Sequence, residues 1–242
     1  MDTVAVLLPV RGRHDFLPIT LQSLFNSNNV ERMELIIVVD HDYKALKIVE
    51  RFIMDHESKA NEVSIFHSAE RVFSVRAFNI ALSLAMSDKF IWVTNTLEYH
   101  QPDWFSRAVG AFTVAFSDDI GVLSLGKKNK ANYGMSSRAF IEYNEGDWFH
   151  SGYKINFCDD ELACRAILLG RYMCLDASGI IPHPHVVSSD LLYESYQEKI
   201  RLKKIDRGLF YQRSETHFGL PEDKIYKWEG FNNIILPLKG RL

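Results

Sequence analysis

The sequence predicts an α/β fold built on a mostly parallel, doubly wound sheet. Short, continuously apolar runs alternate along the chain with segments whose apolar residues recur at helical spacing. Continuously apolar runs are typical of strands buried on both faces, as in parallel sheets that crossover helices cover. With 242 residues, of which 47% are hydrophobic, the chain can also bury one full core.

The first part of the chain carries the clearest alternation. The apolar run Val4–Pro9 predicts a strand, Phe16–Phe25 a helix and Leu35–Val39 a second strand, which together make one βαβ unit. The same patterns then predict a helix, a strand, a helix, a strand and a helix. These elements are, in order, Tyr43–His56, Val63–His67, Val75–Met86, Phe90–Val93 and Pro102–Phe116.

Three consecutive acids open a later helix. Asp159, Asp160 and Glu161 precede apolar residues that fall on one helical face, and Gly170 is the stop signal. Carboxylates at a helix N-terminus lie near unsatisfied N–H groups and the positive end of the helix dipole, which favour the ionised form. These acids are either a chemical site or an ordinary helix cap with solvated neighbours.

The chain divides into a domain and an extension. We expect residues 1–187 to form the α/β domain and residues 188–242 to form a helical extension packed on the same domain. The extension has the pattern of one or two amphipathic helices that end near Gly219.

Charge and cysteine content narrow the function classes. A net charge of −3 provides no general attraction for nucleic acid or anionic membranes, and the one dense basic cluster, residues 127–130, is interpreted as a solvated loop. Three cysteines without C-x-x-C spacing argue against a disulfide framework or a zinc site. The apolar run at residues 4–10 is too short for a membrane span and lacks a signal-peptide layout, so we expect a cytoplasmic protein.

Polar residues follow several of the predicted strands. Residues 11–13 come after the first strand, 40–42 after the second and 94–98 after the fourth. Ligands of open parallel sheets bind outside the carboxyl ends of the strands, so these residues are site candidates. The chain has neither G-x-G-x-x-G nor a P-loop motif, and a bound phosphate would need arginines or a carboxylate-held metal instead.

Four sequence blocks resemble family 2 glycosyltransferases of GT-A fold. The first is VAVLLPVRGRHDFLPITLQSLFNSN with MELIIVVDHD, and the second is SVRAFNIALSLAMSDKFIWV. The third is TLEYHQPDWFSRAV, and the fourth is DDELACRAILLGRYMCLDASGIIPHPH. Their order and spacing agree with the family over roughly residues 3–187. The resemblance implies a hexosyltransferase-like enzyme that uses a nucleotide sugar, with a UDP-sugar as the expected donor and inversion at the anomeric carbon.

The resemblance also implies a pocket for the nucleotide. Asp40 matches the family's acceptor for a base N–H, and Pro9 and Arg11 line the same pocket. Arg76 and Asn79, about one helical turn apart, are implied to lie near the sugar and diphosphate of the donor. The alternatives are a turn-capping role for Asp40 and a surface salt bridge for Arg76.

The catalytic base is implied at the start of the late helix. Counting back from Glu161-Leu162-x-x-Arg165, the family's Asp falls on Asp159, and a gap of one residue would move it to Asp160. Arg165 is a candidate for binding the sugar donor. Glu161 and Arg165 also have the i, i+4 spacing of an ordinary helix pair.

The metal-binding motif departs from the family pattern. Where the family has Asp-x-Asp, this chain has Thr-Asn-Thr-Leu-Glu at residues 94–98, in which Asn95 and Glu98 offer oxygens and Leu97 offers nothing. If Mn²⁺ or Mg²⁺ binds, we expect Glu98, or Asn95, to combine with His183 or His185 and the phosphates. The alternative for the His-Pro-His stretch is a loop fixed by its prolines.

Two function classes follow. The first is an enzyme that moves a sugar from a nucleotide sugar to a hydroxyl of a glycan, a protein or another compound; a nucleic-acid acceptor is disfavoured by the acidic balance. The second is a GT-A domain without turnover that binds a nucleotide sugar or a protein partner.

Overall fold

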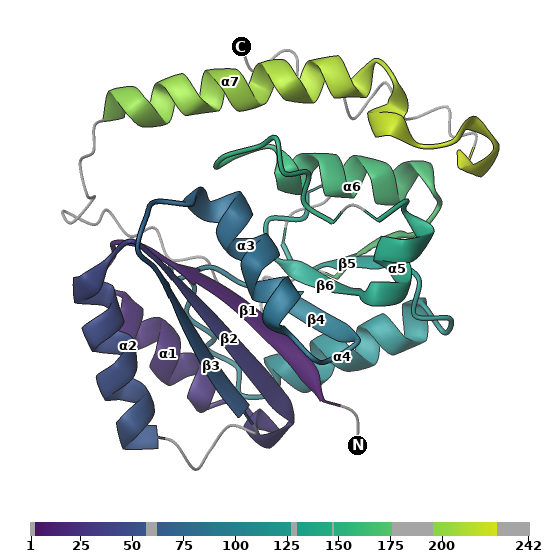
Figure 1. The fold of residues 1–242 in the computed structure, drawn as a ribbon. Coiled ribbons are helices and arrows are strands. Elements are labelled where there is room, and N and C mark those ends of the chain that lie inside the picture. The colour runs from purple at the N-terminus through teal and green to yellow at the C-terminus, as the bar shows by residue number, and fades with distance from the viewer. Residues whose placement is uncertain (1–2, 57–61, 127–129, 147, 176–195, 227–242) are drawn as a thin grey trace.

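A seven-stranded mixed sheet runs through the molecule (Figure 1). The computed structural model describes residues 3–56, 62–126, 130–146, 148–175 and 196–226. The strands lie in the order β3-β2-β1-β4-β6-β5-β7. They are β1 (Val4–Val10), β2 (Met33–Asp40), β3 (Glu62–Ser68), β4 (Lys89–Trp92), β5 (Val122–Ser124), β6 (Gly134–Ser137) and β7 (Tyr172–Cys174).

The four strands that the sequence predicts form a parallel half-sheet. In the register, Leu7 of β1 lies between Ile36 of β2 and Trp92 of β4. β3 pairs in parallel with β2, and β7 in parallel with β5. β6 is antiparallel to both β4 and β5, so the prediction of a mostly parallel sheet is confirmed with one strand reversed.

Helices cover both faces of this sheet (Figure 1). Successive side chains of a strand point to opposite faces, and in β1 both sets are apolar. Val4, Val6 and Leu8 pack against one helical layer, whereas Ala5 and Leu7 pack against the other. The first layer contains α1 (Leu17–Phe25), α2 (Tyr43–His56) and α4 (Trp104–Ala115). The second contains α3 (Phe73–Leu84), α5 (Arg138–Tyr143) and α6 (Cys158–Leu168).

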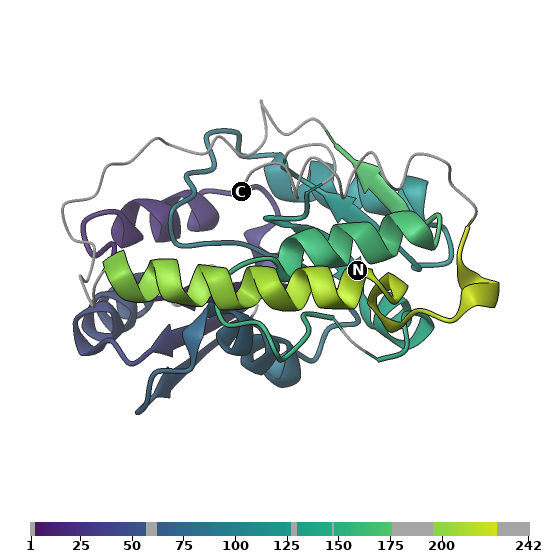
Figure 2. The same ribbon diagram turned by 90° about the horizontal axis from the view of Figure 1, so that it is seen from above.

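α7 (Tyr196–Ser214) forms an outer layer over α6 (Figure 2). Phe210 of α7 is fully buried in the same core cluster as α6 and lies 5.5 Å from Phe157, measured between ring centroids. The helix ends at Ser214, a few residues before the predicted end near Gly219, where a short 3₁₀ turn forms. The described residues also form 3₁₀ turns at Val30–Arg32, His217–Gly219 and Glu222–Lys224.

No helix in the described part of the chain is long and apolar enough to cross a membrane.

Candidate active site

A cavity of about 200 Å³ lies at the carboxyl ends of β1, β2 and β4. The predicted residues Pro9, Arg11, Asp40 and Asn95 all line this cavity, which we call the strand-end cavity. Sequence-distant segments complete it. The other lining residues are Val10, Arg71, Phe73, Ser74, Ala77, Phe78, Thr94 and Ile155.

Asp40 links the end of β2 to the start of α3. Its buried carboxylate accepts hydrogen bonds from the backbone N–H of Val72 at 2.7 Å and of Phe73 at 3.1 Å. These bonds satisfy N–H groups at the helix start, so α3 begins at Phe73, two residues before the predicted Val75. Asp40 therefore has a capping role, and each carboxylate oxygen keeps a further lone pair that can face a ligand.

Arg11 and Asn95 tie the strand ends together. One guanidinium nitrogen of Arg11, Nη1, donates to the carbonyl oxygens of Asp40 at 2.7 Å and His41 at 3.2 Å. The side-chain amide of Asn95 donates to the carbonyl oxygens of Arg11 and Gly12, both at 3.3 Å. The cavity wall is thus held by hydrogen bonds between segments after three different strands.

Asp42, one of the candidate residues after the second strand, supports this wall together with His14, which was not singled out from the sequence. Asp42 accepts from the N–H of Gly12 at 2.7 Å and of Ala45 at 3.0 Å, and its Oδ2 lies 2.9 Å from His14 Nε2. Burial alone would raise the pKa of Asp42, but the bonds from Ala45, Gly12 and His14 outweigh it and lower the pKa. The two residues are far apart in the chain, and no local sequence pattern reports such a contact.

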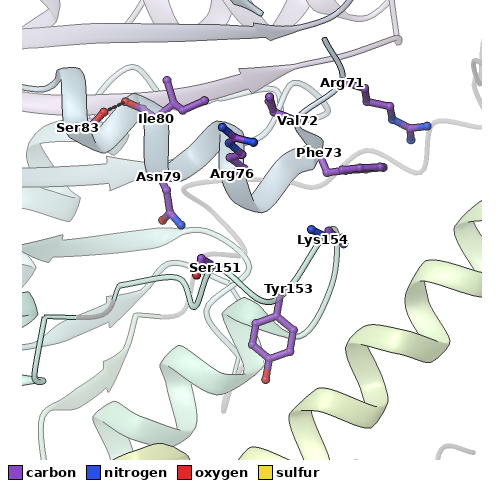
Figure 3. A pocket seen from close by; sticks show the side chains of 10 residues that line it. All are labelled: Arg71, Val72, Phe73, Arg76, Asn79, Ile80, Ser83, Ser151, Tyr153 and Lys154. Carbon is purple, nitrogen blue, oxygen red and sulfur yellow. Dashed lines mark hydrogen bonds between the residues drawn. The ribbon is translucent and has the colours of Figure 1, made fainter.

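Arg76 and Asn79 line a neighbouring cavity of about 410 Å³ (Figure 3). Both come from α3, and Asn79 donates to the Phe149 carbonyl oxygen at 2.9 Å. Arg71 and Phe73 line this cavity as well as the strand-end cavity. Arg76 and Asn79 therefore face a cavity that adjoins the one lined by Asp40, and their place near the sugar and diphosphate of the donor stays a prediction.

Arg71 stands where these two cavities adjoin. Its guanidinium carbon lies 4.5 Å from the centroid of the Phe73 ring, and its Nη1 lies 2.6 Å from Glu198 of α7. An arginine held in this way presents a planar cation that suits phosphate oxygens. The sequence gives no local signal for Arg71, because its carboxylate partner lies in α7.

A third cavity of about 200 Å³ lies at the start of α6 and contains the predicted base. We call it the acid cavity. Asp159 is partly exposed and accepts a hydrogen bond from the side-chain amide of Asn132, whereas Asp160 is buried and lies 3.1 Å from Lys130 Nζ. The remaining lining residues are Asn156, Phe157, Lys203 and Arg207.

The surroundings of Asp159 change its acidity. Burial and repulsion from Asp160 raise the pKa of Asp159 from 3.8 to about 7, although Lys130 works in the opposite direction. A carboxylate with a pKa near neutrality is suited to take a proton from a hydroxyl group.

Asp206 of α7 fixes the loop between the cavities. Its fully buried carboxylate accepts from the N–H groups of Lys154, Ile155 and Asn156, each at 2.9 Å. Each of these residues lines a different cavity. The sequence carried a signal for Asp206, since it stands in a helical apolar stripe between Leu202 and Phe210.

Arg165 does not line any of the three cavities described above. It is a buried residue of α6, and it donates to the Asn144 carbonyl oxygen at 2.6 Å and lies 3.8 Å from Glu161. Glu161 also binds Arg213 through two hydrogen bonds of 2.8 Å and accepts from the Tyr153 hydroxyl at 2.7 Å. This buried network matches the helix-pair alternative for Glu161 and Arg165.

The described residues after β4 do not fit a divalent-cation site. Leu97 is fully buried in the core, and the Asn95 amide donates to the Arg11 carbonyl oxygen. Glu98 Oε1 lies 3.7 Å from His100 Nδ1. In the described ranges, no three His, Cys, Asp or Glu side chains gather as a metal site would require. His183 and His185 lie outside the described residues.

A doubly wound sheet with polar cavities at its strand ends and an acid pair opening a later helix is typical of GT-A glycosyltransferases. The sequence matches glycosyl transferase family 2 over residues 5–171, and the chain belongs to this family. Among curated proteins, none matches the chain.

Solved structures support the same fold class. The mannosyltransferase PcManGT from Pyrobaculum calidifontis, in complex with GDP-Man and Mn²⁺, has a TM-score of 0.65 at 15% identity, covering 98% of this chain and 68% of that one. Residues 1–349 of S. aureus TarS, in complex with UDP, give 0.60 at 16%, covering 96% and 75%. A longer S. aureus TarS structure gives 0.59 at 17%, and the chain spans 36% of it.

Proposed function

We propose that this chain transfers a sugar from a UDP-sugar to an acceptor hydroxyl with inversion of the anomeric carbon. The observation that supports it most is the pairing of two sites in a family 2 chain. One is a cavity at the strand ends lined by Arg11, Asp40 and Arg71, and the other is a cavity at the start of α6 lined by Asp159.

The strand-end cavity is the proposed nucleotide site. Asp40 offers carboxylate oxygens to an imide N–H of uracil, and Arg11 and Arg71 offer positive charge to the diphosphate. Two of the structural neighbours named above are in complex with GDP-Man and with UDP. The imide N–H of uracil would donate to Asp40, and GDP is the competing nucleotide in the test below.

Asp159 is the proposed catalytic base. The acceptor oxygen would attack the anomeric carbon while Asp159 takes the hydroxyl proton. The bond from that carbon to the diphosphate oxygen breaks, and its electron pair leaves with the nucleoside diphosphate. Lys130 holds Asp160 beside it, and Asn132 orients Asp159.

Stabilisation of the leaving group is proposed for the arginines. Guanidinium groups bind phosphate oxygens in the plane of their N–H donors, and Arg71 and Arg76 line adjoining cavities. A cation held by Glu98 with His183 and His185 is a separate proposal, for which the described residues supply one carboxylate.

A binding module without turnover is the second candidate. It is favoured by Leu97, which is fully buried at a position where the family carries its metal-binding acids. Such a domain would keep the strand-end cavity and lose the chemistry.

Calorimetry and a hydrolysis assay separate the two candidates. UDP, GDP and a panel of nucleotide sugars are titrated with and without Mn²⁺, and slow release of sugar from each bound donor is then measured. We expect UDP to bind and its sugar conjugate to be hydrolysed slowly. Binding without any hydrolysis would favour the module. Absence of nucleotide binding would contradict the enzyme and leave only a module that binds a protein partner.

Asp40→Ala tests the nucleotide site itself. Loss of a hydrogen bond to a charged group should weaken UDP binding by about 1.5–3 kcal/mol. The same change leaves two N–H groups of α3 without their acceptor, so it should also lower stability by about 1–3 kcal/mol. Unchanged UDP affinity in a folded variant would move the nucleotide elsewhere.

A further inference from the structure

Two cations of α7 line the acid cavity together with Asp159. Lys203 and Arg207 are one helical turn apart, so both side chains leave α7 on the same side. They come from the helical extension, whereas the acids come from the α/β domain. The cavity is therefore shared between two parts of the chain that lie far apart in sequence.

The position of these cations is fixed by the packing of α7. Leu202 and Phe210 are buried on the side of α7 that faces the domain, and Asp206 between them binds the loop at residues 154–156. Lys203 and Arg207 flank this anchored stripe. The helix cannot turn them away from the cavity without breaking those contacts.

The charges around the cavity do not cancel in pairs. Lys130 is 3.1 Å from Asp160 and offsets that carboxylate, and Asp159 is bound to the neutral amide of Asn132. Among the residues that the structure describes, Lys203 and Arg207 have no carboxylate partner within ion-pair distance. The wall formed by α7 thus carries two positive charges opposite one partly exposed acid.

We infer that the acceptor carries a phosphate group, which Lys203 and Arg207 bind while a hydroxyl of the same molecule faces Asp159. Two adjacent cations suit a group with close to two negative charges, and the arginine fork matches phosphate oxygens. The diphosphate of the sugar donor already has Arg11 and Arg71 at the proposed nucleotide site, which leaves the two cations of α7 for the acceptor. This inference rests on the proposed function.

The test uses glycerol 3-phosphate and glycerol as probes. Binding of each to the full chain is followed by NMR or calorimetry, for the wild type, for Lys203→Ala/Arg207→Ala and for Arg201→Ala/Lys204→Ala. The second variant is the matched control, because it removes the same charge from exposed positions of the same helix. Circular dichroism and thermal unfolding check that both variants fold.

We expect saturable binding of glycerol 3-phosphate but not glycerol, weakened about tenfold or more by Lys203→Ala/Arg207→Ala and little by the control. Absence of saturable binding to the wild type, or equal loss in both variants, would overturn the inference. A loss of UDP affinity in Lys203→Ala/Arg207→Ala would overturn it too, since these cations would then serve the sugar donor.

Transfer assays distinguish this inference from the proposed function. With the donor that is hydrolysed, we expect glycerol 3-phosphate to accept the sugar faster than glycerol does. Donor hydrolysis without that preference would contradict the inference and leave the proposed function standing. Selective binding of glycerol 3-phosphate without any donor hydrolysis would support the anion site and contradict transfer.

Discussion

Asp159 carries most of the proposed chemistry, and its neighbours decide how it ionises. The sequence predicted an acid at this position but left Asp159 and Asp160 as alternatives. The structure distinguishes their surroundings: Asp160 is buried against Lys130, and Asp159 is the more exposed of the two. A base must reach a hydroxyl group, and this favours Asp159.

Asp159→Asn should remove most transfer activity while UDP binding stays nearly intact. An amide of the same shape cannot take the proton, so the loss should be about 10²–10⁴-fold in kcat. Donor turnover and UDP calorimetry measure the two quantities. Activity within about threefold of the wild type would shift the assignment to Asp160, which Asp160→Asn then tests.

The raised pKa of Asp159 predicts how activity depends on pH. The base works only when ionised, so kcat/KM should rise with pH through about 7, the pKa of Asp159. Lys130 lowers this pKa, and Lys130→Ala should therefore move the profile to higher pH. A profile that is flat between about pH 5 and 8 would contradict Asp159 as the titrating base.

Stability should follow the same group with a definite sign. The folded protein holds the Asp159 proton up to about pH 7, whereas the unfolded chain releases it near 3.8. Stability that Asp159 contributes is thus present below its unfolded pKa and lost as pH rises through its folded pKa. Asp159→Asn has no such proton. As the pH rises from 3.8 to about 7, the unfolding temperature of the wild type should therefore fall relative to that of this variant.

At the scale of elements, apolar runs explain which strands the sequence could predict, even though β3 is only partly buried. The strands β1 to β4 appear as apolar runs, and the predicted ranges differ from the observed ones by at most one residue at each end, apart from the start of β2, which differs by two. The strands β5, β6 and β7 are only three or four residues long and were missed. Their formation depends on neighbours supplied by the rest of the sheet.

β6 shows what such a strand requires. Its sequence Gly-Met-Ser-Ser has little strand character, but Ser136 donates to the Gly121 carbonyl oxygen at 2.8 Å. A Cβ atom on Gly134 would lie 2.4 Å from the Leu123 carbonyl oxygen and 2.8 Å from the Trp92 ring. Only glycine lets the strand pass between β4 and β5, and no periodicity reports that need.

The candidate site was predictable to the extent that it follows strand ends. Pro9 ends a predicted strand, Arg11, Asp40 and Asn95 closely follow predicted strands, and all four share one cavity. Arg71, Asp206 and the cations of α7 reach the site through tertiary packing. Local pattern could locate Asp206 as a polar residue in an apolar stripe, but not the loop that it binds.

Asp206→Ala should weaken both the fold and the site. The change leaves three partly buried N–H groups without their acceptor, and each unsatisfied group costs about 1–3 kcal/mol, reduced where water can enter. We expect a lower unfolding temperature and a loss of activity. Asp206→Asn keeps one carbonyl acceptor and should lose less of both, and a variant as stable and active as the wild type would exclude this role.

For the molecule as a whole, the fold places the cavities for the two proposed substrates close together, although different parts of the chain form them. The strand-end cavity depends on the N-terminal half, whereas the acid cavity depends on α6 and α7. The loop at residues 154–156 connects them, since Ile155 lines one and Asn156 the other. Ligand binding at either cavity should therefore stabilise the folded chain as one unit.

UDP should raise the unfolding temperature without Mn²⁺, and Mn²⁺ alone should not. A ligand that binds only the folded state stabilises it by about 2.7 kcal/mol at a hundred times its Kd. Glu98 is the one carboxylate among residues 94–98, and a hard cation needs several oxygens, so the phosphates would have to supply the others. Thermal unfolding is measured with UDP, with Mn²⁺, with both, and with UDP in excess chelator. These measurements show whether UDP binds without the cation and the cation without UDP. Stabilisation by Mn²⁺ alone that Glu98→Gln abolishes would instead establish a metal site in the protein before the nucleotide arrives.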